Sequence, residues 1–158
     1  MNNFQIRKAK PEDTETIFNL IYKLAVYEKL ENDVITSVEE LRTNIFEKKF
    51  AEVLIAEEDE KPVGFALYFH NFSTFVGKPG IYLEDLFVEP ETRGKGYGKA
   101  LLVELARIAK ERNCGRLEWS VLDWNTPSIE FYKSLGAKPM DEWTVFRLDK
   151  DGIENLAK

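Results

Sequence analysis

The fold is decided by residues 86–102, which read LFVEPETRGKGYGKALL. An apolar run ends before Pro90, and a turn containing Gly94, Gly96 and Gly98 leads into a helix-type pattern. The first backbone N–H groups of a helix have no partner within the helix, and the helix dipole gives that end partial positive charge. Glycine lets the backbone approach an anion and adopt positive φ. A strand, this turn and a helix in succession therefore predict a phosphate-binding loop.

The spacing of this loop separates it from two common phosphate-binding motifs. A P-loop ends in Gly-Lys-Ser/Thr after four intervening residues, and a dinucleotide fingerprint is G-x-G-x-x-G directly after the first strand. Here the spacing is G-x-G-x-G, two-thirds of the way along the chain. Arg93, Lys95 and Lys99 add positive charge beside the glycines. On these residues alone, the turn is either a phosphate site or only a tight connection.

Patterns typical of strands and helices alternate along the whole chain, without repeats or linkers. Strands are expected at residues 4–8, 53–57, 63–69, 81–88, 117–122 and 143–148. Helices are expected from Pro11 to Ala25, from Ser37 to Ile45, from the glycine turn to about Asn113, and at Ser128–Leu135. The order β-α-α-β-β-β-α-β-α-β predicts a single α+β domain over residues 1–158, with a mixed, mostly antiparallel sheet flanked by helices.

The composition favours a soluble globular protein with a cationic partner. The formal charge is −6, from 28 acidic and 22 basic side chains. Such a surface repels phosphate backbones and attracts cations, so we expect a cationic substrate and no nucleic-acid partner. No apolar run is long enough to cross a membrane, and the start of the chain lacks the apolar core of a signal peptide. With a single cysteine, Cys114, and no ligand cluster of metal-binding spacing, we expect a cytoplasmic protein without a metal.

Several stretches of the sequence carry a family resemblance. The spacing Arg93-x-x-Gly96-x-Gly98, after the strand 86–90, resembles the acetyl-CoA motif of the GNAT superfamily, and the element order is similar to a GNAT-like fold from residue 4 to residue 149. Further stretches are similar to the spermidine/spermine (diamine) N-acetyltransferase branch, namely AVYEKL at 25–30, YLEDLFV at 82–88, VLDWN at 121–125 and FYKSLGA at 131–137. Within that branch, LDWN at 122–125 is closer to the relatives described as thialysine acetyltransferases.

The resemblance implies an acetyl-CoA-dependent N-acetyltransferase, an enzyme of the acyltransferase class. It would acetylate the primary amine of a small cationic substrate (a diamine, a polyamine or a lysine-like amino acid) by direct attack, and it would be a homodimer. Other readings stay open. A protein or peptide N-acetyltransferase would need a long open groove, and a Rossmann-like nucleotide binder would bind NAD rather than CoA. A non-catalytic acyl-CoA sensor would need the glycine loop but neither Glu84 nor Tyr132.

Glu84 and Tyr132 are the candidates for proton transfer. A lysine-like amine has a pKa of about 10.4, so its neutral form near pH 7 costs about 4–5 kcal/mol, and a carboxylate is suited to binding the ammonium and taking its proton. Glu84 and Asp85 are adjacent on a strand, so only one faces a cleft directly. The resemblance implies Glu84, and Asp85 has either a structural hydrogen bond or a catalytic role. It also makes Tyr132 the general acid for the leaving thiolate, whereas the structural alternative is a tyrosine that completes the core.

The resemblance assigns acetyl-CoA to the glycine loop and to the elements on either side of it. The predicted contacts are Leu86, Phe87, Val88, Arg93, Gly94, Lys95, Gly96, Tyr97, Gly98, Lys99, Asn125, Ser128 and Lys133. A backbone N–H within residues 86–88 is expected to stabilise the oxyanion, while the side chains there pack in the core. Asn125 either bonds the pantetheine amides or caps a helix, and Lys133 either reaches a phosphate or stays solvated.

The predicted amine site combines acidic and aromatic residues, because an ammonium group on an alkyl stem binds through charge pairing and cation–π contacts. Its residues are Tyr27, Glu28, Glu84, Trp119, Trp124 and Glu142, with Phe72 and Phe75 as loop candidates. Relatives that acetylate polyamines carry an acidic residue near this loop, and residues 72–75 contain none. That departure favours a shorter diamine or an amino-acid side chain as the acceptor.

Overall fold

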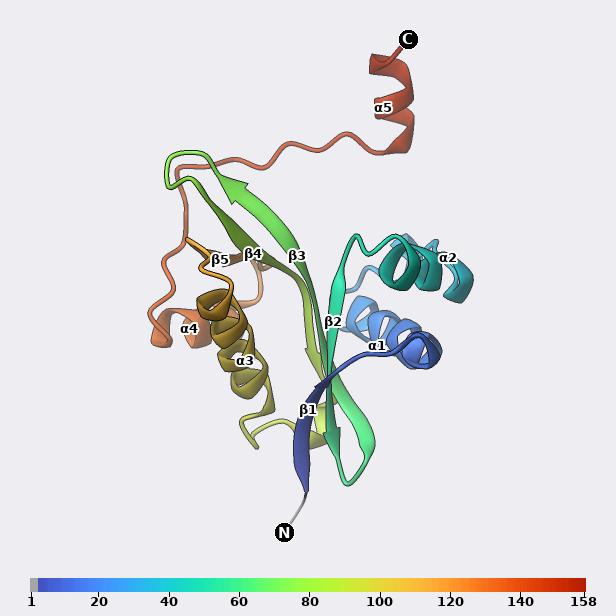
Figure 1. Cartoon of the computed structure of the whole chain (residues 1–158), viewed down its shortest axis with the longest axis vertical. Helices are drawn as coiled ribbons and strands as arrows, with labels where there is room; N and C mark the ends of the chain where they lie inside the picture. The colour runs from blue at the N-terminus through green and yellow to red at the C-terminus, as the bar shows by residue number, and fades with distance from the viewer. Residues whose placement is uncertain (1–2) are drawn as a thin grey trace. The chain divides into compact units, whose positions relative to one another are not determined.

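A computed structural model describes residues 3–158, so the first two residues of the predicted domain lie outside it. The chain divides into two compact units, Met1–Ser120 and Val121–Lys158 (Figure 1). The first unit holds the sheet and three of the α-helices, and the second unit holds two further helices. The interpretation of residues 1–158 as one domain stays a prediction.

The first unit is built on a five-stranded sheet in the order β1-β2-β3-β4-β5. Its strands are β1 (Phe4–Lys8), β2 (Glu52–Glu58), β3 (Lys61–Ser73), β4 (Lys78–Val88) and β5 (Leu117–Trp119). Neighbouring strands are antiparallel from β1 to β4, and β4 and β5 are parallel. The mixed, mostly antiparallel sheet is therefore confirmed.

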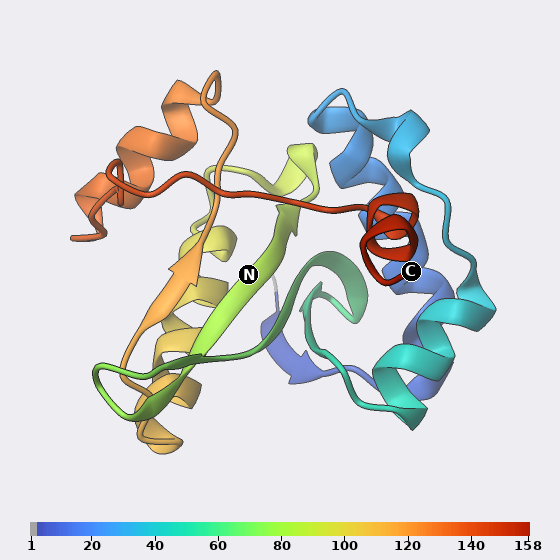
Figure 2. The same ribbon diagram turned by 90° about the horizontal axis from the view of Figure 1, so that it is seen from above.

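Helices lie on both sides of this sheet. α1 (Thr14–Tyr27) and α2 (Val38–Arg42) lie on one side, and α3 (Tyr97–Glu111) lies on the other (Figures 1 and 2). The predicted start of α2 is confirmed, because Ser37 Oγ accepts a hydrogen bond of 3.1 Å from the Glu40 N–H. The core beneath α1 consists of Ile17, Leu20, Leu24, Ile45, Val53, Ile55, Phe65 and Phe87. α1 and α3 form because each buries an apolar stripe against the sheet, whereas α2 packs on α1.

The second unit contains α4 (Thr126–Ser134) and α5 (Lys150–Leu156). The predicted strand at residues 143–148 is wrong, because no strand forms there. Alternating apolar residues form a strand only beside the edge of another strand, and residues 143–148 have no ladder partner among residues 3–158. The helix α5 was not expected. It is capped by Asp149, whose carboxylate accepts a hydrogen bond of 2.9 Å from the Gly152 N–H.

The helices described over residues 3–158 include none that is both long and apolar enough to cross a membrane.

Replacing a core residue of α3 tests this packing. Leu105 is fully buried, and Leu105→Ala should lower the free energy of unfolding by about 2–5 kcal/mol, because the cavity it leaves is only partly filled. Val103 lies on the same helix and is 39% exposed, so Val103→Ala is the matched control and should cost less than about 1 kcal/mol. Urea unfolding measures both values. Equal costs would contradict the burial of this face of α3.

Candidate active site

The glycine loop connects the end of β4 to the start of α3. Gly94 and Gly96 have φ of 87° and 83°, values that favour glycine over any other residue. A Cβ atom at either position would meet no protein atom within 4 Å, so this side of the loop is open. Gly98 was expected to share this backbone geometry, but it lies inside α3. There a Cβ atom would come no nearer than 3.8 Å to Val88, which is ordinary contact.

The predicted cations of the loop have different surroundings. The Arg93 Nε donates a hydrogen bond of 3.2 Å to the Val88 carbonyl, and the guanidinium carbon lies 4.9 Å from the centre of the Tyr27 ring. The Lys95 ammonium lies 2.9 Å from a carboxylate oxygen of Glu58. Lys99 is exposed on the first turn of α3. Arg93 thus ties the loop to the C-terminal end of α1.

Strand β4 has a full partner on one side only. Its ladder with β3 runs from Lys78 to Val88, whereas its ladder with β5 covers only residues 81–83, the last pair being Leu83 and Trp119. The edge of residues 84–88 that faces away from β3 therefore has no ladder partner in the described part of the first unit. Unpaired backbone N–H groups at such an edge are available to a ligand.

A β-bulge in β4 sets the direction of its carboxylates. Leu67 pairs with Asp85 and Tyr68 pairs with Leu83, so Glu84 is the extra residue between two ladder pairs. Glu84 is exposed and Asp85 is partly buried. The structural hydrogen bond, one of the two alternatives for Asp85, is not found among residues 3–158. The bulge therefore lies in residues 84–88, the part of β4 whose outer edge has no ladder partner in the described part of the first unit.

Three carboxylates interact electrostatically here. Burial and, to a smaller extent, the negative charges of Glu84 and Glu28 together raise the pKa of Asp85 to about 7. Burial also raises the pKa of Glu28, with a second contribution from Glu84. Glu28 is the C-cap residue of α1 and follows Tyr27, the residue beneath Arg93. The first unit therefore brings the glycine loop, the end of α1 and the bulge of β4 together. Like charges in this arrangement favour a cationic ligand.

Phe72 and Phe75, the loop candidates, are exposed in the first unit, and a further group of predicted residues belongs to the second unit. Asn125 caps α4, because its side chain accepts a hydrogen bond of 3.4 Å from the Ser128 N–H. Tyr132 is half-buried on α4, with its ring centre 5.7 Å from that of Phe131. Lys133, Trp124 and Glu142 are exposed. The capping role weighed for Asn125 is confirmed.

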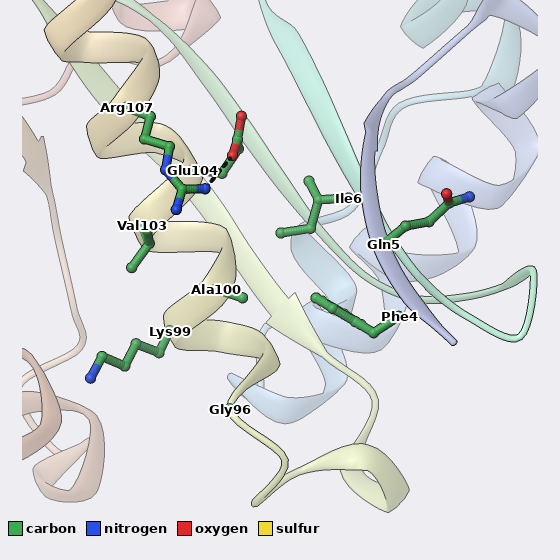
Figure 3. A pocket seen from close by; sticks show the side chains of 9 residues that line it. All are labelled: Phe4, Gln5, Ile6, Gly96, Lys99, Ala100, Val103, Glu104 and Arg107. Carbon is green, nitrogen blue, oxygen red and sulfur yellow. Dashed lines mark hydrogen bonds and ion pairs between the residues drawn. The ribbon is translucent and has the colours of Figure 1, made fainter. Parts of the chain in front are cut away.

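A surface pocket lies beside the glycine loop, between β1 and α3 (Figure 3). Its volume is about 470 Å³. Phe4 and Ile6 of β1 point toward α3, and Arg107 pairs with Glu104 on its rim at 3.3 Å (Figure 3). It shares only Gly96 and Lys99 with the residues predicted to bind the cofactor, and it contains none of the carboxylates at the bulge. The candidate active site is therefore a different surface.

No group of His, Cys, Asp or Glu side chains among residues 3–158 is arranged to hold a metal ion.

Comparison with known proteins assigns the family. The sequence model of the Acetyltransferase (GNAT) family matches residues 15–137, which is most of the chain. The chain belongs to the GNAT family of acetyltransferases. The fold predicted from the order of elements and the enzyme class implied by the family resemblance are confirmed by this match and by the named relatives of this GNAT protein.

The GNAT chain is 40% identical to a thialysine N-epsilon-acetyltransferase of Bos taurus, with 96% of each chain covered. It is 28% identical to an L-ornithine N5-acetyltransferase of Arabidopsis thaliana, over 98% of this chain and 88% of that protein. Among solved structures, an integron cassette protein from the mobile metagenome of V. cholerae has a TM-score of 0.83 and 31% identity, with 98% of both chains covered. The predicted likeness to thialysine acetyltransferases is confirmed.

The raised pKa of Asp85 predicts a specific pH dependence of stability. The ordinary pKa of 3.8 applies to the unfolded chain and the value of about 7 to the folded chain, so the folded chain binds more protons between these values. The contribution of Asp85 to the free energy of unfolding therefore falls as pH rises from about 4 to about 7. Asp85→Asn cannot ionise, and its stability relative to wild type should rise by on the order of 2–4 kcal/mol between pH 4 and pH 8.

Urea unfolding at pH 4, 6 and 8 measures this difference. The matched control is Asp141→Asn, which removes an exposed carboxylate and should shift stability by less than about 0.5 kcal/mol at every pH. A difference between Asp85→Asn and wild type that stays constant with pH would contradict the raised pKa.

Proposed function

We propose that this GNAT protein transfers the acetyl group of acetyl-CoA to the primary amine of a small cationic substrate. The observation behind this proposal is the arrangement in the first unit. There the open glycine loop lies beside a cluster of carboxylates in which Glu28 and Asp85 have raised pKa values. The relatives support the substrate class, because the names thialysine N-epsilon- and L-ornithine N5-acetyltransferase both place the acetyl group on a side-chain nitrogen. A lysine-like amino acid or a short diamine is the acceptor that fits best, and a longer polyamine fits less well.

The glycine loop supports binding of acetyl-CoA. Gly94 and Gly96 leave open space where a Cβ atom would stand, and the N-terminus of α3 offers N–H groups and partial positive charge. The backbone of residues 93–99 holds the pyrophosphate, and residues 86–88 lie along the acyl end. Asn125, Ser128 and Lys133 complete the site from α4. Acetyl-CoA supplies the activated acetyl group, and no metal takes part.

Acidic groups bind the amine and take its proton. Glu84 at the bulge accepts the proton, directly or through water, while Glu28 and Asp85 hold the ammonium near them. A bound cation lowers the cost of charging Asp85, whose pKa in the free protein is raised to about 7. Tyr27, Trp119, Trp124 and Glu142 line the rest of the acceptor site.

The transfer is a direct attack without an acyl-enzyme. The neutral amine nitrogen forms a bond to the acetyl carbon, and the carbon–sulfur bond breaks. A backbone N–H within residues 86–88, at the unpaired edge of β4, donates to the oxyanion. The first proton of the ammonium leaves through Glu84 before the attack. Tyr132 donates its phenolic proton to the leaving thiolate and is reprotonated by the second proton, which the nitrogen loses as the amide forms.

Thiol release from acetyl-CoA tests the reaction. With a panel of diamines, polyamines, thialysine, ornithine and lysine, we expect saturable release with at least one cationic amine. Tyr132→Phe should lower kcat about 100-fold or more and leave the KM for acetyl-CoA nearly unchanged, because the phenol acts only as the thiolate leaves. The control is Tyr22→Phe, which changes an exposed tyrosine on α1.

The outcomes separate the reaction from the role of Tyr132. If acetyl-CoA binds but no amine stimulates release, the small-amine assignment fails and a peptide acceptor or a sensor role moves ahead. If Tyr132→Phe keeps the wild-type kcat, the reaction stands and the acid is another group.

The proposal includes a single domain and a homodimer. The family match at residues 15–137 crosses the boundary between the two units, which supports one domain over residues 1–158. The segment of residues 140–148 supports a second copy, because it presents Met140, Trp143, Val145, Phe146 and Leu148 as exposed apolar side chains. Soluble monomers rarely expose so continuous an apolar stretch. The single cysteine and the use of acetyl-CoA suit a cytoplasmic enzyme.

Size-exclusion chromatography with light scattering tests the dimer. The wild type should have twice the chain mass of 18.3 kDa. Phe146 is 91% exposed, and Phe146→Glu should shift the mass toward one chain because a charge would be buried at the contact. Ile35 is 93% exposed in another part of the chain, so Ile35→Glu is the matched control and should stay dimeric. A monomeric wild type at micromolar concentration would contradict the dimer.

A further inference from the structure

One carboxylate oxygen contacts the glycine loop from outside the proposed active site. Glu58 is the last residue of β2, and its Oε2 lies 2.9 Å from the Lys95 ammonium. The same Oε2 accepts a hydrogen bond from the Tyr97 hydroxyl. Lys95 and Tyr97 are the residues on either side of Gly96, which has positive φ and is the N-cap of α3. Glu58 therefore holds both neighbours of the residue on which the loop turns.

The Tyr97 side chain is a rigid part of this contact. It is buried, and its ring stacks on the Phe4 ring with centroids 4.0 Å apart and planes 10° from parallel. The hydrogen bond to Glu58 raises the pKa of Tyr97 to about 12, so the hydroxyl stays protonated and donates at neutral pH. Tyr97 is the first residue of α3, and its stacked ring and its hydrogen bond to a carboxylate together restrict its side chain to one conformation.

Glu58 is itself held in place. It pairs with Phe4 in β1 and with Lys61 in β3. The next residue, Asp59, receives a hydrogen bond of 2.9 Å from the Asn3 N–H and donates one of 2.8 Å to the Asn3 carbonyl. The β2–β3 turn is therefore tied to the first strand on one side and to the glycine loop on the other.

We propose that Glu58 is a positioning residue for the pyrophosphate of the acyl donor. The contacts of Glu58 with Lys95 and Tyr97 form a brace that holds the glycine loop, and Lys95 belongs to this brace instead of contacting phosphate. This rests on the proposed function, since it takes the glycine loop to bind the pyrophosphate of acetyl-CoA. Glycines with positive φ, such as Gly94 and Gly96, give a free loop many conformations. Binding a ligand to one of these conformations costs conformational entropy, which weakens the affinity. Holding Lys95 and Tyr97 fixes Gly96 beforehand and leaves its surroundings open to the ligand.

The charges of the loop agree with a structural role for Lys95 and a phosphate-binding role for Arg93 and Lys99. An ammonium paired with a carboxylate adds no net charge for a phosphate, so Lys95 contributes little while Glu58 binds it. Arg93 and Lys99, together with the N-terminus of α3, supply the positive charge instead. The brace acts on donor binding alone, because Glu28, Glu84 and Asp85 lie on α1 and β4, outside its contacts.

Calorimetric titration of the full chain with CoA, combined with steady-state kinetics, tests the proposal. Glu58→Gln should raise the Kd for CoA and the KM for acetyl-CoA about tenfold, because it removes an ionic acceptor shared by two donors. kcat at saturating acetyl-CoA and the KM for the amine should change less than about twofold. Tyr97→Phe keeps the stacked ring and should weaken CoA binding about threefold. Glu60→Gln, an exposed carboxylate in the same turn, is the matched control and should match wild type.

A double-mutant cycle identifies the role of Lys95. If Lys95 serves the brace, Lys95→Met weakens CoA binding in the wild-type background and has no further effect in Glu58→Gln. If Lys95 contacts phosphate and Glu58 only competes for it, Glu58→Gln tightens CoA binding, and Lys95→Met costs more in that background than in wild type. That second pattern overturns the proposal.

Two further results would contradict the proposed role of Glu58. An unchanged Kd for CoA in Glu58→Gln leaves the proposed function standing and removes the brace. A parallel loss of CoA affinity, amine affinity and kcat, with a lower Tm, means that Glu58 stabilises the fold in general. Failure of the wild type to bind CoA at all is a failure of the proposed function itself, and the titration of wild type shows it before any variant is compared.

Discussion

The structure depends on the unequal pairing of β4, which forms a long ladder with β3 on one side and only a short ladder with β5 on the other. Its ladder with β3 spans nearly its full length, whereas its ladder with β5 stops at Leu83. Gly64 lets β3 approach closely enough for this, since a Cβ atom there would lie 2.6 Å from the Phe87 carbonyl oxygen. The rigid side keeps the backbone of residues 84–88 in place, and the open side makes it accessible. The glycine loop follows the end of β4, so its position also depends on that pairing.

Charge is distributed unevenly around this strand. Burial and the charges of neighbouring carboxylates raise the pKa values of Glu28 and Asp85, while Arg93 lies over Tyr27 next to Glu28. The cationic loop and the acidic cluster therefore meet at the end of α1. An enzyme with one anionic and one cationic substrate requires such adjacent regions of opposite charge, and electrostatic complementarity of this kind favours encounter as well as binding.

The sequence predicted those features whose signals are local. The glycine loop, α3 and the capping of α2 by Ser37 depend on residues within a few positions of one another, and each was found at its expected place. The contact between Glu58 and Lys95 joins residues 37 positions apart and has no motif, so only the folded chain shows it. The strand at residues 143–148 failed for the same reason, because alternation of apolar residues does not specify a partner. Asp85 was recognised as a candidate, but its burial and its unpaired carboxylate depend on the bulge.

The bulge at Glu84 has a consequence for how such a site is gained or lost. Leu67 and Tyr68 are consecutive, and their partners Asp85 and Leu83 are separated by one residue. Deleting position 84 would leave a regular ladder with every other pair unchanged. The sheet would keep its strand order, but the carboxylate proposed to accept the amine proton would be gone. A single codon inserted into or removed from β4 thus separates an ordinary antiparallel pair from one that carries the proposed proton acceptor, and this fold has a short genetic route between the two.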